Sequence, residues 1–384
     1  MHIAAFAQYV PFPTDNLQLW LRADSVGLTD GRVSRWFDLS HNRYEIVQTN
    51  AAARPTLSSD LLNGQPVLTF NGAQQLVGQA LPLLNQNWTF FVVARTFAKT
   101  GSEQLLVGNG ASGGGTNRYR LGIDCFASTN HTPTPTSWAG QINNNTFHII
   151  DFECRNDELR GIFRINNNLV ATIAYNAAFG NNTGNLKIGA YDNPTTLSLN
   201  GQIAEIIAFN TVDSTLRSQV YSYLYNKYAL TTVNLGLDIH SYSFADTAIN
   251  TAYNHNFVSY LWSTGETDSV IHVSKPGKYW VTVTNAFGYS SSDTINVFYP
   301  EPAQLRDTTI CAGDAIVWST GLDGPYTYLW SDGSTESSIE ITTAGEYFVT
   351  ITDTLGFSWK SDTITVKVDS FPVTAIIYHL PFII

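Results

Sequence analysis

The sequence predicts an all-β chain, in which an antiparallel sandwich with one short helix at its end precedes two small β-sandwich modules. Three observations predict this fold class. Short alternating apolar runs, separated by Gly, Asn, Asp and Pro, fill residues 17–208. Only one segment, after residue 213, shows helical spacing of apolar residues. Beyond residue 230 the chain turns Thr/Ser/Val-rich and repeats itself at a period of about 68 residues.

The composition fits a secreted binding protein better than a nucleic-acid or membrane protein. The 384 residues predict two or three domains, and a hydrophobic content of 43% with a mean hydropathy of −0.07 suffices for packed cores. A formal net charge of −11 disfavours nucleic acid and anionic membranes, which both need a basic partner. No apolar run approaches the roughly 20 residues of a spanning helix, so we expect no membrane insertion.

Residues 1–8 are predicted to be the remnant of a signal peptide. Ala5–Ala7 fits the small-x-small pattern of a signal-peptidase site, although the basic region and most of the apolar region are missing. The alternative is an ordinary disordered start. The first interpretation predicts a secreted protein.

The first folded domain is predicted to span residues 9–232. Its strand-like runs include Leu17–Leu21, Pro66–Phe70, Trp88–Ala94 and Phe147–Phe152, with turn signals such as Asn71-Gly72 between them. The alternation predicts two stacked antiparallel sheets.

One amphipathic helix is expected to close this domain. Asp213 or Ser214 is a candidate N-cap. After it, apolar residues recur at helical spacing, at Leu216, Val220 and Leu224 and then at Tyr228.

The repeat predicts two modules, residues 233–300 and 301–370. Tyr260–Ser263 returns as Tyr328–Ser331, and Gly277–Thr284 returns as Gly345–Thr352. Each copy has the length of a small β-sandwich filled by one Trp. Residues 371–384 are expected to form an extra strand or the start of a truncated next module. Five tryptophans in patterned strands are predicted core residues: Trp20, Trp36, Trp88, Trp262 and Trp330.

Three cysteines do not make a disulfide framework. Cys125 and Cys154 can pair if their strands are neighbours, which would leave Cys311 alone. The alternative is that all three are small buried hydrophobic residues.

The sequence gives only weak matches to the residue patterns of catalytic sites. Asp151 and Glu153 flank Phe152 and lie on one face of a predicted strand, so they are the one candidate acid/base pair. We favour the alternative, a solvent-facing edge with Phe152 turned inward. Gly110–Gly114 matches Gly-x-Ser-x-Gly, but the polar residues that follow predict a loop rather than a nucleophile elbow. The eight histidines show no zinc spacing.

Binding residues are therefore sought in loops, where an aromatic ring can stack on a sugar and polar groups can take its hydroxyls. The loop-rich segments are 108–120, 126–145 and 189–199. The candidate ligand-binding residues are Trp138, Tyr191, Asp192 and Asn193, with Arg118 and Tyr119 behind them. The alternative for each is loop packing.

Several motifs resemble one known superfamily. The segments Leu19–Asp24, Val33–Ser40, Arg54–Thr56, Leu62–Gly72 and Gly201–Ile207 together resemble the laminin-G-like branch of the concanavalin A-like lectin/glucanase superfamily. The resemblance covers roughly residues 16–230. It implies a jelly-roll sandwich that binds carbohydrate or protein ligands, often with calcium. Asn71, Gln74, Gln75 and Gln202 stand where bacterial members often carry acidic residues, and calcium affinity rises with ligand charge.

The repeats resemble PKD- or immunoglobulin-like modules of large secreted bacterial surface proteins. Asp307–Gly313 matches their Asp-Thr-x-x-Cys-x-Gly pattern. Such modules commonly carry a second cysteine where this chain has Phe357, so the pattern for a disulfide at Cys311 is incomplete. The resemblance implies immunoglobulin-like sandwiches on a bacterial cell surface.

These observations predict a non-catalytic, adhesin-like extracellular binding protein rather than an enzyme. Its lectin-like head is expected to recognise a glycan or an extracellular matrix protein, with calcium as the one cofactor that the resemblance suggests and the metal ligands unknown. Other cell-surface subunits are further candidate partners. Two alternatives stay open: a polysaccharide-degrading enzyme of the same superfamily, and a structural subunit of a surface assembly.

Overall fold

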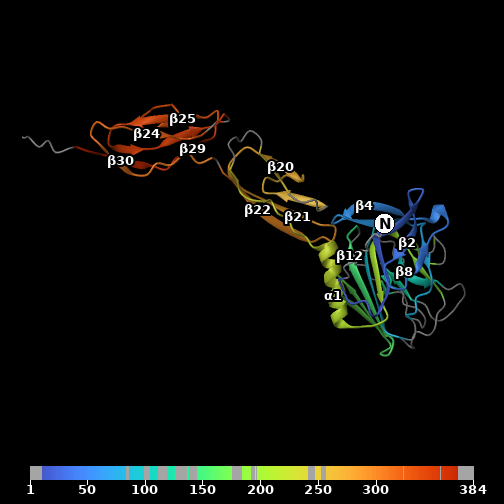
Figure 1. The fold of residues 1–384 in the computed structure, drawn as a ribbon. Helices are drawn as coiled ribbons and strands as arrows, with labels where there is room; N and C mark the ends of the chain where they lie inside the picture. The colour runs from blue at the N-terminus through green and yellow to red at the C-terminus, as the bar shows by residue number, and fades with distance from the viewer. Residues whose placement is uncertain are drawn as a thin grey trace, which may run out of the picture. The chain divides into compact units, whose positions relative to one another are not determined.

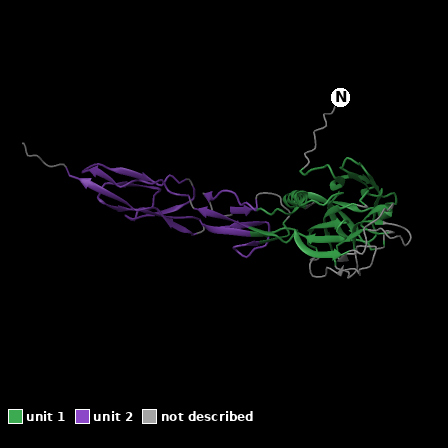
Figure 2. Cartoon of the chain, turned by 90° about the horizontal axis from the view of Figure 1, so that it is seen from below, with its two compact units in different colours: residues 1–232, 253–260, 282–291 green, residues 233–252, 261–281, 292–384 purple. Residues whose placement is uncertain are grey.

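The computed structural model describes most of the chain and divides it into two compact units (Figures 1 and 2). The described residues are 11–83, 86–98, 104–110, 119–123, 125–126, 136–137, 145–174, 184–191, 195, 197–240, 247–251, 257–298, 300–322, 324–354 and 356–370. Unit 1 comprises residues 1–232, 253–260 and 282–291, and unit 2 comprises residues 233–252, 261–281 and 292–384.

Unit 1 is built on antiparallel strands, as predicted. They are β1 (Leu17–Thr29), β2 (Arg32–Asp38), β3 (Glu45–Val47), β4 (Thr56–Leu62), β5 (Gln65–Asn71), β6 (Leu76–Gly78), β7 (Trp88–Thr96), β8 (Leu105–Gly110), β9 (Arg120–Gly122), β10 (Cys125–Phe126), β11 (Thr136–Ser137), β12 (His148–Arg155), β13 (Arg160–Ile165), β14 (Asn168–Ala174), β15 (Asn185–Ile188) and β16 (Asn200–Phe209). A single 3-10 turn, η1 (Ala51–Ala53), precedes β4.

The large sheet has the order β14-β13-β12-β7-β16-β1-β2-β3-β6-β15-β8-β9, and β5 pairs with both β16 and β4. Strand β1 pairs with β16 through its first half and with β2 through its second, with a register shift between Leu21 and Val26. The two halves of the sheet enclose one inner core, which includes Phe152 of β12, Trp36 of β2 and Leu186 of β15. The all-β sandwich predicted from alternation is confirmed.

The outer side of the β7-β16-β1 region carries a second core beneath the helix. Helix α1 (Ser214–Leu224) begins at Asp213, whose side chain accepts a 2.6 Å hydrogen bond from the Leu216 backbone N–H. Val220 and Leu224 are buried, and each contributes about 1.5–3 kcal/mol by its removal from water. The helix continues into a π-helical turn, η2 (Tyr225–Ala229), where Tyr228 is buried as well. The predicted N-cap and apolar stripe are confirmed.

A β-bulge in β16 sets which side chains reach this outer core. The pairing with β7 runs from Ile203 opposite Ala94 directly to Glu205 opposite Val93, so Ala204 is the extra residue. Ala204 belongs to the outer core, whereas Ile203 and Ile206 belong to the inner one. The bulge therefore places Glu205 on the helix-covered side of the sheet, opposite Arg22 of β1.

Residues 282–291 complete unit 1. The Asn285 side chain donates a 2.8 Å hydrogen bond to the carbonyl of Ala229 at the end of η2. The ring of Phe287 lies 6.0 Å from that of Phe147, and both belong to the outer core. This turn is thus packed against the sandwich of residues 11–232.

Each repeat forms a small β-sandwich, as predicted. The first has strands β17 (Ile239–His240), β18 (Thr247–Asn250), β19 (Ser259–Trp262), β20 (Val270–Val273), β21 (Gly277–Thr284) and β22 (Ser290–Phe298). The second has strands β23 (Thr308–Cys311), β24 (Ile316–Ser319), β25 (Thr327–Trp330), β26 (Ser338–Ile341), β27 (Gly345–Tyr347), β28 (Val349–Thr352), β29 (Ser358–Lys360) and β30 (Ile364–Asp369).

The two modules repeat their central interaction. Trp262 and Trp330 are buried, and their indole N–H groups donate to the carbonyls of Asp268 and Glu336, six residues later in each case, at 2.8 and 2.7 Å. Each module also begins with a strand that pairs in parallel with its last strand, β17 with β22 and β23 with β30. All five tryptophans predicted to be core residues are buried.

Cys154 is a free, fully buried thiol in the inner core, and burial raises its pKa. Cys311 is also free and is half-buried. The structure therefore supports the buried-hydrophobe alternative for Cys154 and not its pairing with Cys125. Within the described ranges, no helix is long and apolar enough to cross a membrane.

Candidate functional site

An open, shallow groove runs beside helix α1. It consists of two cavities of about 690 and 380 Å³. Thr215 and Gln219 line both cavities, so the two adjoin at these side chains. We call this surface the α1 groove. Both parts are within the volume range of small-molecule sites, about 300–1,000 Å³.

One wall of the α1 groove is a stripe of uncharged polar side chains on α1 and η2. The stripe is exposed and consists of Thr215, Ser218, Gln219, Ser222 and Asn226. Their spacing of three or four residues places them on one face of the helix. Ser, Thr and Asn are weaker helix formers than Lys, Glu or Ala, so helix stability does not account for this face. Hydroxyl and amide groups can donate and accept hydrogen bonds alike.

The opposite wall is the segment before β1. Pro11 lines the larger cavity and Pro13 the smaller one. Between them, Phe12 is 5% exposed, and its ring lies 5.2 Å from that of Trp20 and 5.4 Å from that of Tyr223. The buried Phe12 ring therefore fixes both prolines beside the helix.

A buried carboxylate, that of Glu205, positions two residues that line the larger cavity. Glu205 is fully buried, and its Oε1 accepts a 2.6 Å hydrogen bond from the indole N–H of Trp20. Its Oε2 accepts from the Tyr228 hydroxyl at 2.6 Å, from the Lys227 ammonium at 2.8 Å and from the Tyr223 hydroxyl at 3.2 Å. Tyr223 and Lys227 both line the cavity, so the carboxylate positions two groove residues from below.

The same network keeps the hydroxyls of Tyr223 and Tyr228 protonated. Burial raises the pKa of Tyr223, and the neighbouring Glu205 carboxylate raises that pKa further. Burial and Glu205 likewise raise the pKa of Tyr228. Both phenols therefore remain neutral hydrogen-bond donors at physiological pH.

The charges of the α1 groove are unevenly distributed. Among the described residues, Lys227 is the only charged side chain that lines the larger cavity, and its ammonium is paired with Glu205. The smaller cavity is lined by Asp15 and Asp213, with no cationic side chain among its lining residues. The larger part is therefore close to neutral and the smaller part is acidic.

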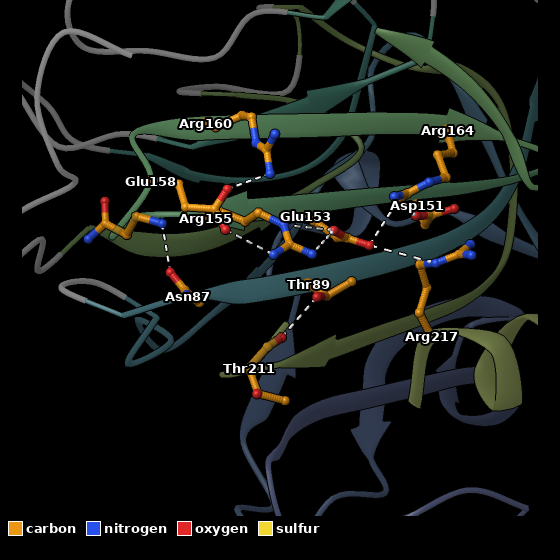
Figure 3. A network of polar contacts seen from close by, with 11 residues as sticks. Asn87, Thr89, Asp151, Glu153, Arg155, Glu158, Arg160, Arg164, Thr211 and Arg217 are labelled. Carbon is orange, nitrogen blue, oxygen red and sulfur yellow. Dashed lines mark hydrogen bonds and ion pairs between the residues drawn. The ribbon is translucent and has the colours of Figure 1, made fainter. Parts of the chain in front are cut away.

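The acidic pair Asp151 and Glu153 lies elsewhere on the outer side of the sheet (Figure 3). The inward direction of Phe152 is confirmed, since this residue belongs to the inner core. The predicted solvent-facing edge is wrong, because β12 pairs with both β7 and β13. The exposed fractions of Asp151 and Glu153 are 0% and 2%.

Arginine side chains form ion pairs with both carboxylates. Nη1 of Arg164 lies 2.9 Å from Asp151 Oδ1 and 2.7 Å from Glu153 Oε1. Arg155 contacts Glu153 at 3.1 Å, and Arg217 of α1 approaches it to 3.7 Å (Figure 3). Burial raises the pKa of Asp151, against the lowering effect of Arg164. This network ties α1 to the strands, and its carboxylates are covered rather than open to a substrate.

Two of the six predicted ligand-binding residues are described, and both are buried. Tyr119 is 4% exposed, with its ring 5.4 Å from that of Trp88, and burial raises its pKa. Tyr191 is 3% exposed, and its carbonyl accepts a 2.7 Å hydrogen bond from Gln75. Such placements fit the loop-packing alternative for these two rings. Trp138, Asp192, Asn193 and Arg118 lie outside the described residues.

Sequence reasoning missed the α1 groove, because its walls are about 200 residues apart in the chain. One signal was available: the exposed face of the predicted helix carries no charged residue at positions 215, 218, 219, 222 and 226. Surface helices normally carry charged residues there.

No cluster of three or more His, Cys, Asp or Glu side chains that could hold a metal ion occurs in the described part of the chain. The side chains that line the α1 groove include two carboxylates, Asp15 and Asp213, and Asp213 is engaged as the helix N-cap. This donor set is poorer in charge than a typical calcium site.

Comparisons with known proteins give only distant likenesses. No protein-family model matches the chain, and no curated protein matches it. Among solved structures, Trypanosoma rangeli sialidase in complex with sialic acid matches with a TM-score of 0.40 and 16% identity, over 55% of this chain and 33% of that chain. The binding domain of Paraclostridial Mosquitocidal Protein 1 matches with a TM-score of 0.41 and 13% identity, over 71% of this chain and 64% of that one.

The receptor binding domain of botulinum neurotoxin D has a TM-score of 0.41 and 9% identity, over 71% of this chain and 74% of that one. The chain thus spans about a third of the length of the sialidase and just under two thirds of the mosquitocidal binding domain. At these identities and TM-scores the likenesses carry no argument about function.

Proposed function

We propose that this chain is a non-catalytic extracellular binding protein of the adhesin type, whose sandwich head recognises a glycan at the α1 groove. The observation that carries the proposal is the pairing of an exposed, uncharged Ser/Thr/Gln/Asn stripe with a Tyr and a Lys that a buried carboxylate fixes from below. Sugar hydroxyls need a mixture of donors and acceptors, which these side chains supply. Their fixed positions reduce the ordering cost of binding.

The aromatic content of the site is compatible with this assignment. Tyr223 presents a ring that is held between Phe12 and Trp20, with centroid distances of 5.4 and 6.4 Å. A held ring contributes apolar contact at little entropic cost, while its hydroxyl proton is engaged by Glu205. Hydroxyl- and amide-bearing residues make up most of the remaining lining, and their carbon atoms together with Pro11 leave apolar surface for the C–H face of a sugar.

A non-catalytic role is supported by the state of the candidate acid/base pair. A glycosidase needs one carboxylate that is open to the glycosidic oxygen and a second that faces the anomeric carbon or a water. Asp151 and Glu153 are instead buried and bound by Arg164, Arg155 and Arg217. We place the protein on a bacterial cell surface or in the secreted fraction, on the resemblance of its repeats alone.

The proposal is tested by screening the whole chain on a glycan array, once with calcium and once with chelator. We expect binding of at least one glycan class, and no hydrolysis of bound glycans during long incubation. A folded protein that binds no glycan under either condition would contradict the proposal. Hydrolysis of glycans by the purified chain would contradict the non-catalytic part, and its loss either in the double variant Asp151→Asn with Glu153→Gln or in Tyr223→Phe would locate the catalytic side chains.

A further inference from the structure

We propose that the α1 groove takes an oligosaccharide of two or more sugar units across two adjoining subsites, and that its charge selects neutral and amino-bearing sugars over acidic ones. This inference rests on the proposed glycan-binding function and specifies the ligand of the same site. The two cavities, their shared lining residues and the distribution of charge carry it.

The first step is the length of the ligand. The two cavities share Thr215 and Gln219, so ligand units in both would contact the same two side chains. On the opposite wall Pro11 lines the larger cavity and Pro13 the smaller one, on either side of the buried Phe12. Both walls therefore place the two cavities one after the other beside the helix, which suits a linear chain of sugars better than one ring.

The second step is the charge of the larger subsite. Lys227 is the one cation among the described residues that line it, and its Nζ lies 2.8 Å from the fully buried Glu205 carboxylate. The same nitrogen also lies 3.2 Å from the Tyr223 hydroxyl, and the Lys227 side chain is only 16% exposed. Its charge is compensated before any ligand arrives. The larger subsite thus lacks the unpaired cation that a carboxylate or sulfate on a sugar needs.

The third step is the charge of the smaller subsite. Asp15 and Asp213 are exposed and line this cavity with Asn16, Thr211 and the shared Thr215 and Gln219. Asp213 accepts a hydrogen bond from Leu216 N–H through Oδ1, which leaves Oδ2 available. A sugar with a protonated amine gains from these carboxylates, and an acidic sugar is repelled.

The test uses the full chain and an oligosaccharide array of one to six units that contains neutral, amino-bearing and acidic members of matched length. Affinities for the bound series are then measured by titration calorimetry at low ionic strength. We expect the affinity to rise at least tenfold from one unit to two or three units. Acidic members should bind at least fivefold more weakly than neutral ones of equal length, since unscreened charges at a few ångströms have an effect of that order in water.

Two variants test whether the oligosaccharide binds at the α1 groove. Gln219→Arg places a long side chain at the position shared by both cavities and should reduce binding of oligosaccharides at least tenfold. The control Leu169→Arg puts the same residue on strand β14, at a side chain that is 64% exposed and lines neither cavity, and should bind as the wild type does. Thermal unfolding of both variants reports whether they fold.

The charge is tested separately with the double variant Asp15→Asn and Asp213→Asn. Asn caps a helix as well as Asp does, so α1 is retained while two charges are removed. Discrimination against acidic members should then fall to less than twofold. The inference is overturned if the chain binds glycans but binds single sugars as tightly as longer ones, prefers acidic members, or binds unchanged after Gln219→Arg. Binding of no glycan at all instead overturns the proposed function.

Discussion

The indole N–H of Trp20 donates a 2.6 Å hydrogen bond to Oε1 of Glu205, which lies 185 residues later in the sequence. The bond joins adjacent strands β1 and β16 on the side of the sheet that α1 covers. Three other donors share the same carboxylate, from Tyr223, Lys227 and Tyr228. The buried Glu205 carboxylate thus links strand β1, helix α1 and the η2 turn to strand β16.

We expect Glu205→Gln to lower the free energy of unfolding of unit 1 by about 3 kcal/mol. The variant leaves the Lys227 ammonium without its counter-charge in a nearly dry site, and breaking such a pair typically costs 3–5 kcal/mol. Urea denaturation followed by tryptophan fluorescence measures the change. The double variant Glu205→Gln with Lys227→Met should recover part of the loss, and a double variant that is less stable than Glu205→Gln would contradict this account.

Asp151→Asn should gain stability relative to the wild type as the pH rises from 4 to 7.5. Burial raises the pKa of Asp151 in the folded chain. The carboxyl therefore contributes most to stability below its unfolded-state pKa, and this contribution is lost as the pH rises through the folded-state pKa. The amide has no such loss. Denaturation midpoints at a series of pH values measure the difference.

The control for that series is Asp157→Asn, which changes an exposed carboxyl in the turn that follows β12. It reports how the same Asp-to-Asn change alters stability across the pH series when no buried carboxyl is involved. An Asp151→Asn variant that loses stability relative to the wild type over the same rise in pH would show that the ion pair with Arg164 outweighs desolvation.

Gly201→Ala should destabilise the sandwich by several kcal/mol or prevent its folding. A Cβ at residue 201 would lie 2.1 Å from the carbonyl oxygen of Arg95 and 2.9 Å from Cα of Thr96, both backbone atoms of the adjacent strand β7. Backbone atoms cannot move aside as a flexible side chain does. Gly27→Ala in β1 is the matched control, because its nearest atom would lie at an ordinary 3.5 Å. Soluble yield and thermal unfolding compare the two, and equal stability would refute the assignment.

Trp330→Ala should remove about 3–5 kcal/mol from the second repeat, since this side chain is almost fully buried against Trp318, at a ring distance of 5.0 Å. The head should be unaffected, because its cores contain no residue of this module. Limited proteolysis with mass spectrometry should show early cleavage within residues 301–370 and a protected fragment that contains residues 11–298. Simultaneous loss of both parts would mean that they unfold as one cooperative unit.

Local patterns predicted the elements well, for physical reasons that are visible in particular residues. The spacing of Val220 and Leu224 reports a buried helix face directly, and Asp213 is a cap because its short side chain reaches the next turn. The tryptophans of the repeats are predicted core residues because successive side chains in a strand point to opposite faces, which places each Trp on the apolar face. These properties depend on neighbours within a few residues.

The burial of charges was not predictable in the same way. Asp151 and Glu153 have the alternation of an exposed strand face, and they are covered only because β13 supplies Arg164 and α1 supplies Arg217. The α1 groove likewise depends on Phe12 meeting Trp20 and Tyr223. The order of strands in the sheet decides which of these distant side chains come into contact. Alternation of apolar and polar residues alone does not determine that order.

The extra residue in β16 has a consequence for how this chain tolerates insertions and deletions. If Ala204 were paired with β7 in regular alternation instead of forming the bulge, every side chain from 205 to 209 would exchange faces. Ile206 would then leave the inner core, and the Glu205 carboxylate would enter it, away from Lys227. Deletion of Ala204 would instead restore a regular pairing and keep Glu205 opposite Val93 on the helix-covered side, so this strand is expected to tolerate the loss of that one residue.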